Sequence, residues 1–442
     1  MLRQAKQILS TLQKAGYEAY IVGGYVRGFL LSGSKPDFCL GQNREQDIDI
    51  CSSASPDQVI TLFDRVLKTG YAYGTVSIVM DGMLFEHTSF RRDLDYLPNS
   101  RSAIVSYGAS FREDAARRDF TINALAMDGD GKIYDFFGGV EDLKRGLIRA
   151  IGDPKERFRE DALRKLRAVR FAGMLGFQIE AETLGAIQAS PGLGGLSAER
   201  IKAELDRILQ SEHRGYALML LKEAGLHREI LAPWADEARY ERAVRRVELL
   251  SEGRTEILSE GRTEILYAAL MFEFSVQEAE EAMRRLKFSK KQAEAVRGLL
   301  GEHRFRRPKL SEPELREWMA ELGPERAEDL LCLLEADAMV YGDTATKEGA
   351  DAAPNAESTL AYLITLRDMV AELKQKPLLF SKKELAVNGN DLIHHLHLRK
   401  EEHPLLGELL DHLLRICIRE PEKNTRATLL NVAANYKRGS ES

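Results

Sequence analysis

Gln46-Asp47-Ile48-Asp49-Ile50 places two carboxylates one residue apart in an apolar run. Side chains of a β-strand alternate between two faces, so we expect Asp47 and Asp49 to point the same way. Two such anions repel each other and need a compensating charge. Mg²⁺ supplies it, since it takes one or two carboxylates and leaves other positions to water and phosphate. A solvent-facing acidic pair on an edge strand is the alternative.

The composition is that of a globular protein. The chain has 442 residues, of which 44% are hydrophobic and 30% are charged, and its net charge is −6. This negative charge excludes a uniformly basic nucleic-acid binder but allows a local basic groove. No apolar run is long enough to span a membrane, and the first residues lack the apolar core of a secretory signal. The four cysteines form no CxxC pair, which predicts reduced thiols in a cytoplasmic protein.

A glycine turn precedes the acidic strand. We expect a helix over residues 3–14 and a strand over 19–22, which runs into GGYVRG at residues 23–28. Two glycines let the backbone approach a ligand closely, and their N–H groups can hold phosphate. Arg27, one helical turn further on, is placed to add a guanidinium fork. A lone turn of this kind is weak evidence, but a nucleotide needs both a phosphate cradle and a metal.

The next segments supply a loop, a helix and a hairpin. Residues 31–45 are turn-rich and predict a loop, and a helix over 56–66 begins at Ser55-Pro56. Residues 75–80 and 83–88 predict two strands joined by an Asp-Gly turn. Glu86 lies on the second strand, and whether it joins the aspartates stays open. His87 then points to the opposite face and is expected to be structural.

The segment RRDFTIN at residues 117–123 carries a second group of polar side chains. Asp119 and Asn123 are four residues apart, so on a helix they share a face and are placed to grip a ribose hydroxyl. Arg118 is placed to meet a triphosphate. The alternative is a solvated, salt-bridged helix start.

Residues 156–177 predict a helix with a buried apolar stripe and a charged flank. Leucine and valine recur at helical spacing along the stripe. The charged flank is predicted to hold Asp161, Arg164, Arg167 and Arg170. Three stacked arginines repel one another unless an anion lies beside them, and a triphosphate is the predicted anion.

Asp161 and Arg164 also have the chemistry of a base reader. Adenine and cytosine each present an amino donor beside a ring-nitrogen acceptor, whereas guanine and uracil present the reverse. A carboxylate beside a guanidinium therefore matches ATP and CTP, and mismatched polar groups in a closed site are costly. An i, i+3 surface salt bridge is the alternative.

The series GGYVR, DID, RRDFTIN, DFFGG, EDALR and SAERIKAELDRIL resembles the class II tRNA nucleotidyltransferases. These are the CCA-adding enzymes of the polymerase β-like nucleotidyltransferase superfamily. The likeness covers roughly residues 1–210 and returns at KELAVNGNDL, residues 383–392. It implies an α+β fold, with an N-terminal nucleotidyltransferase head of mixed β-sheet and flanking helices followed by an all-α neck, body and tail. The implied boundaries are 1–138 for the head, 139–212 for the base-recognising neck, 213–343 for the body and 344–442 for the tRNA-binding tail.

The resemblance also implies the site. Asp47 and Asp49 would be the catalytic residues and hold two Mg²⁺ ions. Gly24, Arg27 and Arg118 would contact the phosphates, and Asp119 and Asn123 the sugar region. The remaining nucleotide contacts would be Asp161 and Arg164, which pair with the base, together with Arg167 and Arg170.

The implied activity is template-independent, metal-dependent addition of CCA to the 3′ end of tRNA from CTP and ATP, with release of pyrophosphate. The implied partner is the tRNA acceptor arm, with no membrane and no obligate protein partner. An enzyme that adds only the final A stays open, because Gly28 and the long loop 31–45 depart from the family pattern. A CC-adding enzyme is disfavoured by the full-length segment 90–120. A poly(A) polymerase and a non-catalytic tRNA-binding protein are weaker alternatives.

The rest of the chain shows helical periodicity. The predicted core residues are Leu218, Leu220, Leu221, Leu226 and Ile230. Trp234 and Trp318 are expected to be packing residues rather than platforms for a base. SEGRTEIL at residues 251–258 is repeated at 259–266 and is interpreted as a duplication that lengthens a loop or helix junction. Residues 344–358 are the predicted linker. The histidines near residue 395 are expected to be surface or packing residues, because no acidic or cysteine partner completes a metal site.

Overall fold

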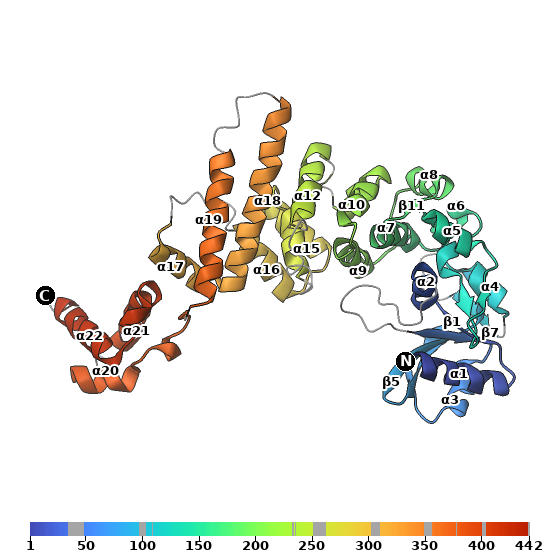
Figure 1. Ribbon diagram of the computed structural model, residues 1–442, viewed down its shortest axis with the longest axis horizontal. Helices are drawn as coiled ribbons and strands as arrows, with labels where there is room; N and C mark the ends of the chain where they lie inside the picture. Colours follow the sequence, from blue (N-terminus) through green and yellow to red (C-terminus); the bar gives the residue numbers. More distant parts are fainter. Residues whose placement is uncertain are drawn as a thin grey trace. The chain divides into compact units, whose positions relative to one another are not determined.

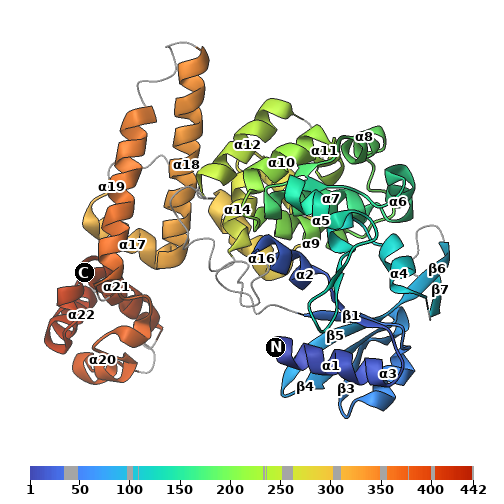
Figure 2. The same cartoon turned by 45° about the vertical axis from the view of Figure 1, so that its right-hand side comes forward.

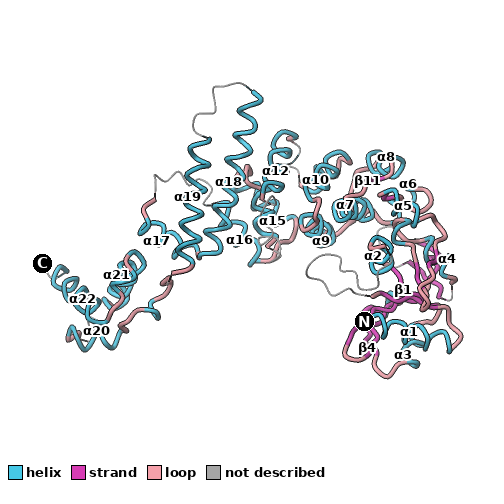
Figure 3. The backbone as a smooth tube through the Cα atoms, viewed as in Figure 1, coloured by secondary structure: helices cyan, strands magenta, loops and turns pink. Residues whose placement is uncertain are grey.

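The computed structural model describes residues 1–33, 48–96, 103–107, 109–231, 234, 236–250, 262–301, 310–348, 356–376, 378–399 and 404–440. The chain forms two compact units. One comprises Met1–Glu241 and Glu280–Phe288, and the other Arg242–Ala279 and Ser289–Ser442. Figure 3 shows that the strands gather in the first part of the chain and that helices make up the rest. The predicted α+β class is confirmed.

A mixed sheet of seven strands forms the N-terminal part of the described chain, in the order β3-β4-β5-β2-β1-β8-β9. Strand β2 lies antiparallel to β1 and parallel to β5. The predicted hairpin is confirmed as the antiparallel pair β4 and β5. The strands are β1 (Ala19–Val22), β2 (Asp49–Ser52), β3 (Val66–Gly70), β4 (Thr75–Met80), β5 (Met83–Ser89), β8 (Ala126–Met127) and β9 (Ile133–Tyr134).

Helices α1 (Leu2–Lys14) and α3 (Pro56–Leu62) lie side by side against this sheet (Figure 1, Figure 2). The predicted helix over 3–14 is confirmed, and its apolar stripe is buried. A capping box between Ser55 and Gln58 starts α3. This helix ends before residue 66, as the chain continues into β3 at Val66. Helix α2 (Gly24–Leu31) begins directly after the glycine turn.

The segment between β5 and β8 contains a second, two-stranded sheet. Strands β6 (Arg91–Tyr96) and β7 (Ala103–Tyr107) pair antiparallel, and α4 (Phe111–Ala116) follows. The prediction of a helix carrying Asp119 and Asn123 is wrong. Phe120 instead forms a β-bridge with Ala150, and only a short 3₁₀ helix follows at Thr121–Asn123.

The predicted neck is mostly helical. Its helices are α5 (Gly139–Arg145), α6 (Pro154–Glu160), α7 (Leu163–Leu175), α8 (Ala181–Ala189) and α9 (Ala198–Leu209). Two short parallel strands, β10 (Leu147–Ile148) and β11 (Gln178–Ile179), are the departure from the all-α expectation. They fasten the segment before α6 to the segment after α7.

The described chain beyond α9 is helical. Its α-helices are α10 (Arg214–Glu223), α11 (Leu226–Ile230), α12 (Glu237–Leu249), α14 (Thr263–Leu270), α15 (Val276–Arg285), α16 (Lys290–Gly301), α17 (Glu312–Leu322), α18 (Pro324–Glu348), α19 (Ala356–Lys374), α20 (Gly389–Leu396), α21 (Leu405–Arg419) and α22 (Arg426–Ser440). The packing roles of Trp234 and Trp318 are confirmed, since both are buried. The predicted core is also confirmed, with Leu218, Leu220, Leu221, Leu226 and Ile230 buried.

The predicted linker is wrong at both of its described ends. Helix α18 continues to Glu348, through Gly342, and α19 begins at Ala356. Residues 349–355 lie outside the described residues.

The described end of the duplicated segment, from Thr263, begins α14. His394 and His395 lie in α20, and His397 caps it.

Three of the cysteines, Cys51, Cys332 and Cys417, are buried, and Cys39 lies outside the described residues. Among the helices that the structure describes, none has the length and apolar character that crossing a membrane requires.

His87 on β5 is structural, as predicted. Its ring is fully buried, and its Nε2 lies 2.7 Å from the hydroxyl of Ser52. Burial lowers the pKa of His87 to about 4. The neutral imidazole is therefore favoured in the folded protein, and His87 adds stability above its ordinary pKa of 6.5 that is lost as the pH falls towards 4.

Replacing His87 by Gln should flatten the pH dependence of folding between pH 6.5 and 4. The expected loss of slope is up to about 1.4 kcal/mol per pH unit, because the titrating group is gone while a polar side chain remains beside Ser52. The measurement is the free energy of unfolding by urea at several pH values, with hydrogen–deuterium exchange of the β4 and β5 amides as a local check. If the free energy of unfolding depends on pH equally in variant and wild type, the assignment is contradicted.

Candidate active site

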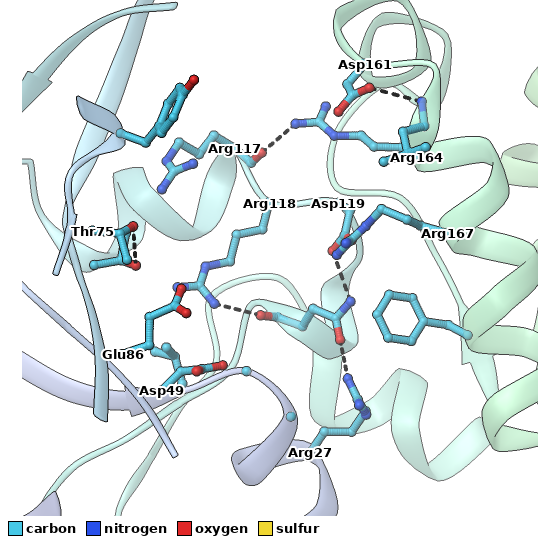
Figure 4. Close-up of a pocket in the computed structure, with 18 of the residues that line it drawn as sticks. Arg27, Asp49, Thr75, Glu86, Arg117, Arg118, Asp119, Asp161, Arg164 and Arg167 are labelled. Carbon is cyan, nitrogen blue, oxygen red and sulfur yellow. Dashed lines mark hydrogen bonds and ion pairs between the residues drawn. The ribbon is translucent and has the colours of Figure 1, made fainter. Parts of the chain in front are cut away.

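A cavity of about 610 Å³ opens in the first compact unit, between the sheet and the helices α7 and α9. Figure 4 shows residues from both sides pointing into it. Of the predicted site residues, the cavity brings together Gly24, Arg27, Asp49, Arg118, Asp119, Asn123, Asp161, Arg164 and Arg167. Arg170 is not among the lining residues, and Asp47 lies outside the described residues.

The acidic edge of the cavity is formed by two adjacent strands. Asp49 begins β2, and the parallel register that pairs Ile50 with His87 places Asp49 beside Glu86 of β5. Figure 4 shows these two carboxylates close together. A Cβ atom on Gly23 would lie 3.0 Å from Asp49 Oδ2, and Gly23 has φ of 72°. The carboxylate therefore lies directly against the glycine turn, where a larger residue would collide with it.

Arg27 lies at the base of the cavity on α2. It is buried, and its Nη1 donates a hydrogen bond of 2.5 Å to Asn123 Oδ1. Its guanidinium lies 5.1 Å from the centre of the Phe171 ring. Burial lowers the pKa of Arg27 to about 10, so the side chain is still charged at neutral pH.

Asp119 connects the segment after α4 to helix α7. Its Oδ1 accepts hydrogen bonds from the Phe120 amide at 2.8 Å and from Asn123 Nδ2 at 3.0 Å. Its Oδ2 accepts one from Arg167 Nε at 2.7 Å. Burial acts to raise the pKa of Asp119, but Arg167 and these hydrogen bonds outweigh it and hold the pKa below its usual value. The predicted proximity of Asp119 and Asn123 is thus present without the predicted helix.

Arg118 is held at the cavity wall by a carboxylate that the sequence reasoning missed. Buried Asp114 of α4 pairs with Arg117 at 2.6 Å and with Arg118 at 3.2 Å. Arg118 Nη1 also donates to the Asn123 carbonyl at 3.0 Å. The i, i+3 and i, i+4 spacing of the aspartate and the two arginines within FREDAARR could have predicted these ion pairs.

Asp161 and Arg164 both line the cavity but do not share a helix. Asp161 follows the end of α6, and its Oδ1 accepts the Leu163 amide at 3.0 Å, which caps the start of α7. Arg164 Nη1 donates to Glu160 at 2.6 Å, and its Nη2 donates to the Arg117 carbonyl at 2.9 Å. The predicted single flank is therefore wrong, although the pair lies at one end of the cavity.

The three arginines of α7 do not need an external anion, so that prediction is wrong. Protein carboxylates already lie beside each of them: Glu160 beside Arg164, Asp119 beside Arg167 and Glu204 beside Arg170. The guanidinium of Arg170 lies 4.3 Å from the centre of the Phe171 ring, and Arg27 and Arg167 also pack against this ring. A nucleotide would join an existing network rather than create one.

The cavity still carries an excess of positive charge. Among the described residues that line it, seven arginines face four carboxylates, an excess of three. The lining residues for which no role was predicted from the sequence include Tyr73, Thr75, Thr88, Arg117, Phe171 and Arg200. Arg200 lies within the quoted motif SAERIKAELDRIL, and its Nη2 donates to Asp161 Oδ2 at 2.9 Å. The excess of positive charge among the lining residues suits a polyanionic ligand.

Three family models match the chain. The models described as "Poly A polymerase head domain", "Probable RNA and SrmB- binding site of polymerase A" and "tRNA nucleotidyltransferase domain 2 putative" match residues 19–149, 176–238 and 261–433. The crystal structure of the Bacillus stearothermophilus CCA-adding enzyme in complex with CTP is 31% identical, with a TM-score of 0.72. That similarity covers 100% of this chain and 98% of the Bacillus chain.

The chain belongs to the class II tRNA nucleotidyltransferase family. Curated members of this family include the CCA-adding enzyme of Geobacillus sp. (strain WCH70), 45% identical over 51% of this chain and 53% of the relative. The CCA-adding enzyme of Leuconostoc mesenteroides is 44% identical over 49% of this chain and 52% of the relative. The chain thus spans about half the length of the curated relatives it matches.

Replacing Asp119 by Asn should destabilise the first unit by about 2 kcal/mol, because a charged hydrogen bond to Arg167 is lost in a buried network. Thermal melting and hydrogen–deuterium exchange of α7 are the measurements. The control is Glu141→Gln, which breaks the exposed pair between Glu141 and Arg145 and should cost less than about 0.5 kcal/mol. Equal effects of the two changes would show that Asp119 does not hold the network.

Proposed function

We propose that this protein adds C, C and A to the 3′ end of tRNA from CTP and ATP, without a template and with release of pyrophosphate. The observation that carries the proposal is a single cavity with three kinds of group. Asp49 and Glu86 lie at one edge, arginines line the middle, and Asp161 and Arg164 lie at the neck end. A relative with CTP bound shares the fold over the whole chain.

The donor chemistry of the acidic edge fits Mg²⁺. Asp49 and Glu86 offer hard carboxylate oxygens on neighbouring strands, and strand alternation predicts Asp47 on the same face. Within the described residues no group of three or more possible metal ligands occurs, and Asp47 is not among those residues. Two bound Mg²⁺ ions would lower the pKa of the attacking 3′-hydroxyl and neutralise the leaving pyrophosphate.

The arginines would bind and orient the triphosphate. Arg27 and Arg118 lie on the phosphate side of the proposed site, and each is held by other groups of the chain before a ligand arrives. Such prior placement lowers the entropy cost of aligning the reacting groups. The proposed contribution of the protein to catalysis is therefore positioning and charge neutralisation, with no covalent intermediate.

Asp161 and Arg164 would choose the base. The carboxylate accepts from the amino group of cytosine or adenine, and the guanidinium donates to the adjacent ring nitrogen. Guanine and uracil would place an oxygen against the carboxylate and an N–H against the guanidinium, which leaves buried polar groups unpaired. One pair of side chains can thus accept two nucleotides and reject the other two.

The tRNA acceptor arm is the proposed second substrate. We propose that residues 1–138 act as the nucleotidyltransferase head and 139–212 as the neck, with residues 213–343 as the body. Residues 344–442 are the proposed tRNA-binding tail. Double-stranded RNA is read mostly by shape and phosphate contacts, which suits the helical body and tail.

The test uses three tRNAs that end at the discriminator base, at C and at CC, each incubated with Mg²⁺ and CTP, ATP or both. We expect CCA on the first, CA on the second and A on the third, because the same base-reading pair serves each step. Gel sizing of the products gives the answer. A single A on the CC end, with nothing from CTP, would identify an A-adding enzyme instead.

Asp49→Asn is the matched variant for this assay. It removes one metal-binding charge and nearly preserves shape, so we expect at least a thousandfold loss of extension, on the order of 4 kcal/mol, with unchanged melting. Near-native extension by this variant would contradict the metal assignment. Long A tails would indicate a poly(A) polymerase, and binding of tRNA without extension by the wild type would indicate a non-catalytic binder.

A further inference from the structure

Arg200 on α9 contacts the proposed base-reading carboxylate directly. Its Nη2 donates to Asp161 Oδ2 at 2.9 Å, and both residues line the cavity. The other oxygen of Asp161 accepts the Leu163 amide at 3.0 Å. Groups from two helices, the start of α7 and the start of α9, therefore hold the two oxygens of one carboxylate.

Arg164 is held just as firmly. Its two terminal nitrogens donate to the Arg157 carbonyl at 3.1 Å, to Glu160 at 2.6 Å and to the Arg117 carbonyl at 2.9 Å. These partners lie in or near α6 and in the segment after α4. The guanidinium plane is consequently set without help from Arg200. Of the two base-reading side chains, Asp161 is the one whose orientation depends on α9.

We propose that Arg200 is a positioning residue that determines base selectivity by fixing the Asp161 carboxylate. The inference rests on the proposed function and adds the residue that sets its specificity. Oδ2 has a second lone pair, so it can accept the amino group of cytosine or adenine while it accepts from Arg200. A fixed acceptor at that point repels the carbonyl oxygen that uracil or guanine would place there.

Without Arg200, the bond from the Leu163 amide is the remaining hydrogen bond to this carboxylate within the described residues. Its side chain is 34% exposed, so it can turn towards solvent and leave the cavity. The penalty against uracil and guanine then falls, because no acceptor is held opposite their oxygens. Cytosine and adenine lose a hydrogen bond at the same time. Selectivity should therefore fall more than the overall rate of transfer.

The experiment compares wild type with Arg200→Gln and Arg200→Lys, using full-length protein and tRNA substrates. For each enzyme kcat and KM are measured for CTP and UTP on tRNA ending at the discriminator base, and for ATP and GTP on tRNA ending in CC. We expect Arg200→Gln to lower the preference for CTP over UTP, and for ATP over GTP, by about tenfold. Arg200→Lys should restore part of it, since an ammonium can donate one of the bonds.

Arg207→Gln is the matched control. Arg207 lies on the same helix, pairs with Glu204 at 3.6 Å and has a side chain 55% exposed. It is not among the residues that line the cavity. We expect this change to leave both nucleotide preferences unaltered.

Three results would overturn the inference. An equal fall in activity with all four nucleotides would show that Arg200 only supports the fold. A lower KM for CTP in Arg200→Gln would show that Arg200 competes with the base for Asp161. Failure of the wild type to incorporate either CTP or ATP would contradict the proposed function itself, and the inference with it.

Discussion

The buried carboxylate of Asp119 is the interaction on which the rest of the site depends. It accepts from Asn123, which in turn accepts from Arg27 of α2, and it also accepts from Arg167 of α7. A continuous chain of charged and polar groups thus connects α2, the helix after the glycine turn, with α7. Removing one member would leave buried charges without partners, which is more costly than the loss of an exposed ion pair.

The cavity is built before a ligand arrives. Its arginines have partners within the protein: Asp114 holds Arg118, Glu160 holds Arg164 and Asp119 holds Arg167. These partners offset most of the repulsion among the cations and fix their directions. An excess of positive charge remains among the residues that line the cavity. Preorganisation of this kind lowers the ordering cost that a triphosphate would otherwise incur on binding.

Local patterns were predictable from sequence, whereas long-range partners were not. The β4–β5 hairpin and the opposite faces of Glu86 and His87 follow from a turn and from strand alternation. The hydrogen bond between Arg200 and Asp161 joins helix α9 to the residue after α6, and no periodicity in the sequence predicts it. The same holds for the β-bridge of Phe120 with Ala150, which replaced the predicted helix. Residue spacing and chemistry singled out the candidate site residues and the resemblance gave them roles, whereas the internal partners of the arginines came from the structure.

If this chain's own side chains choose the base, with no template, the choice should already be present in the binding of free nucleotides. The measurement is the binding of CTP, ATP, UTP and GTP to the wild-type protein with Mg²⁺ and without tRNA. Calorimetric titration should give dissociation constants for CTP and ATP at least about tenfold lower than those for UTP and GTP. Equal affinity for all four nucleotides would contradict the claim, because the choice would then require the tRNA.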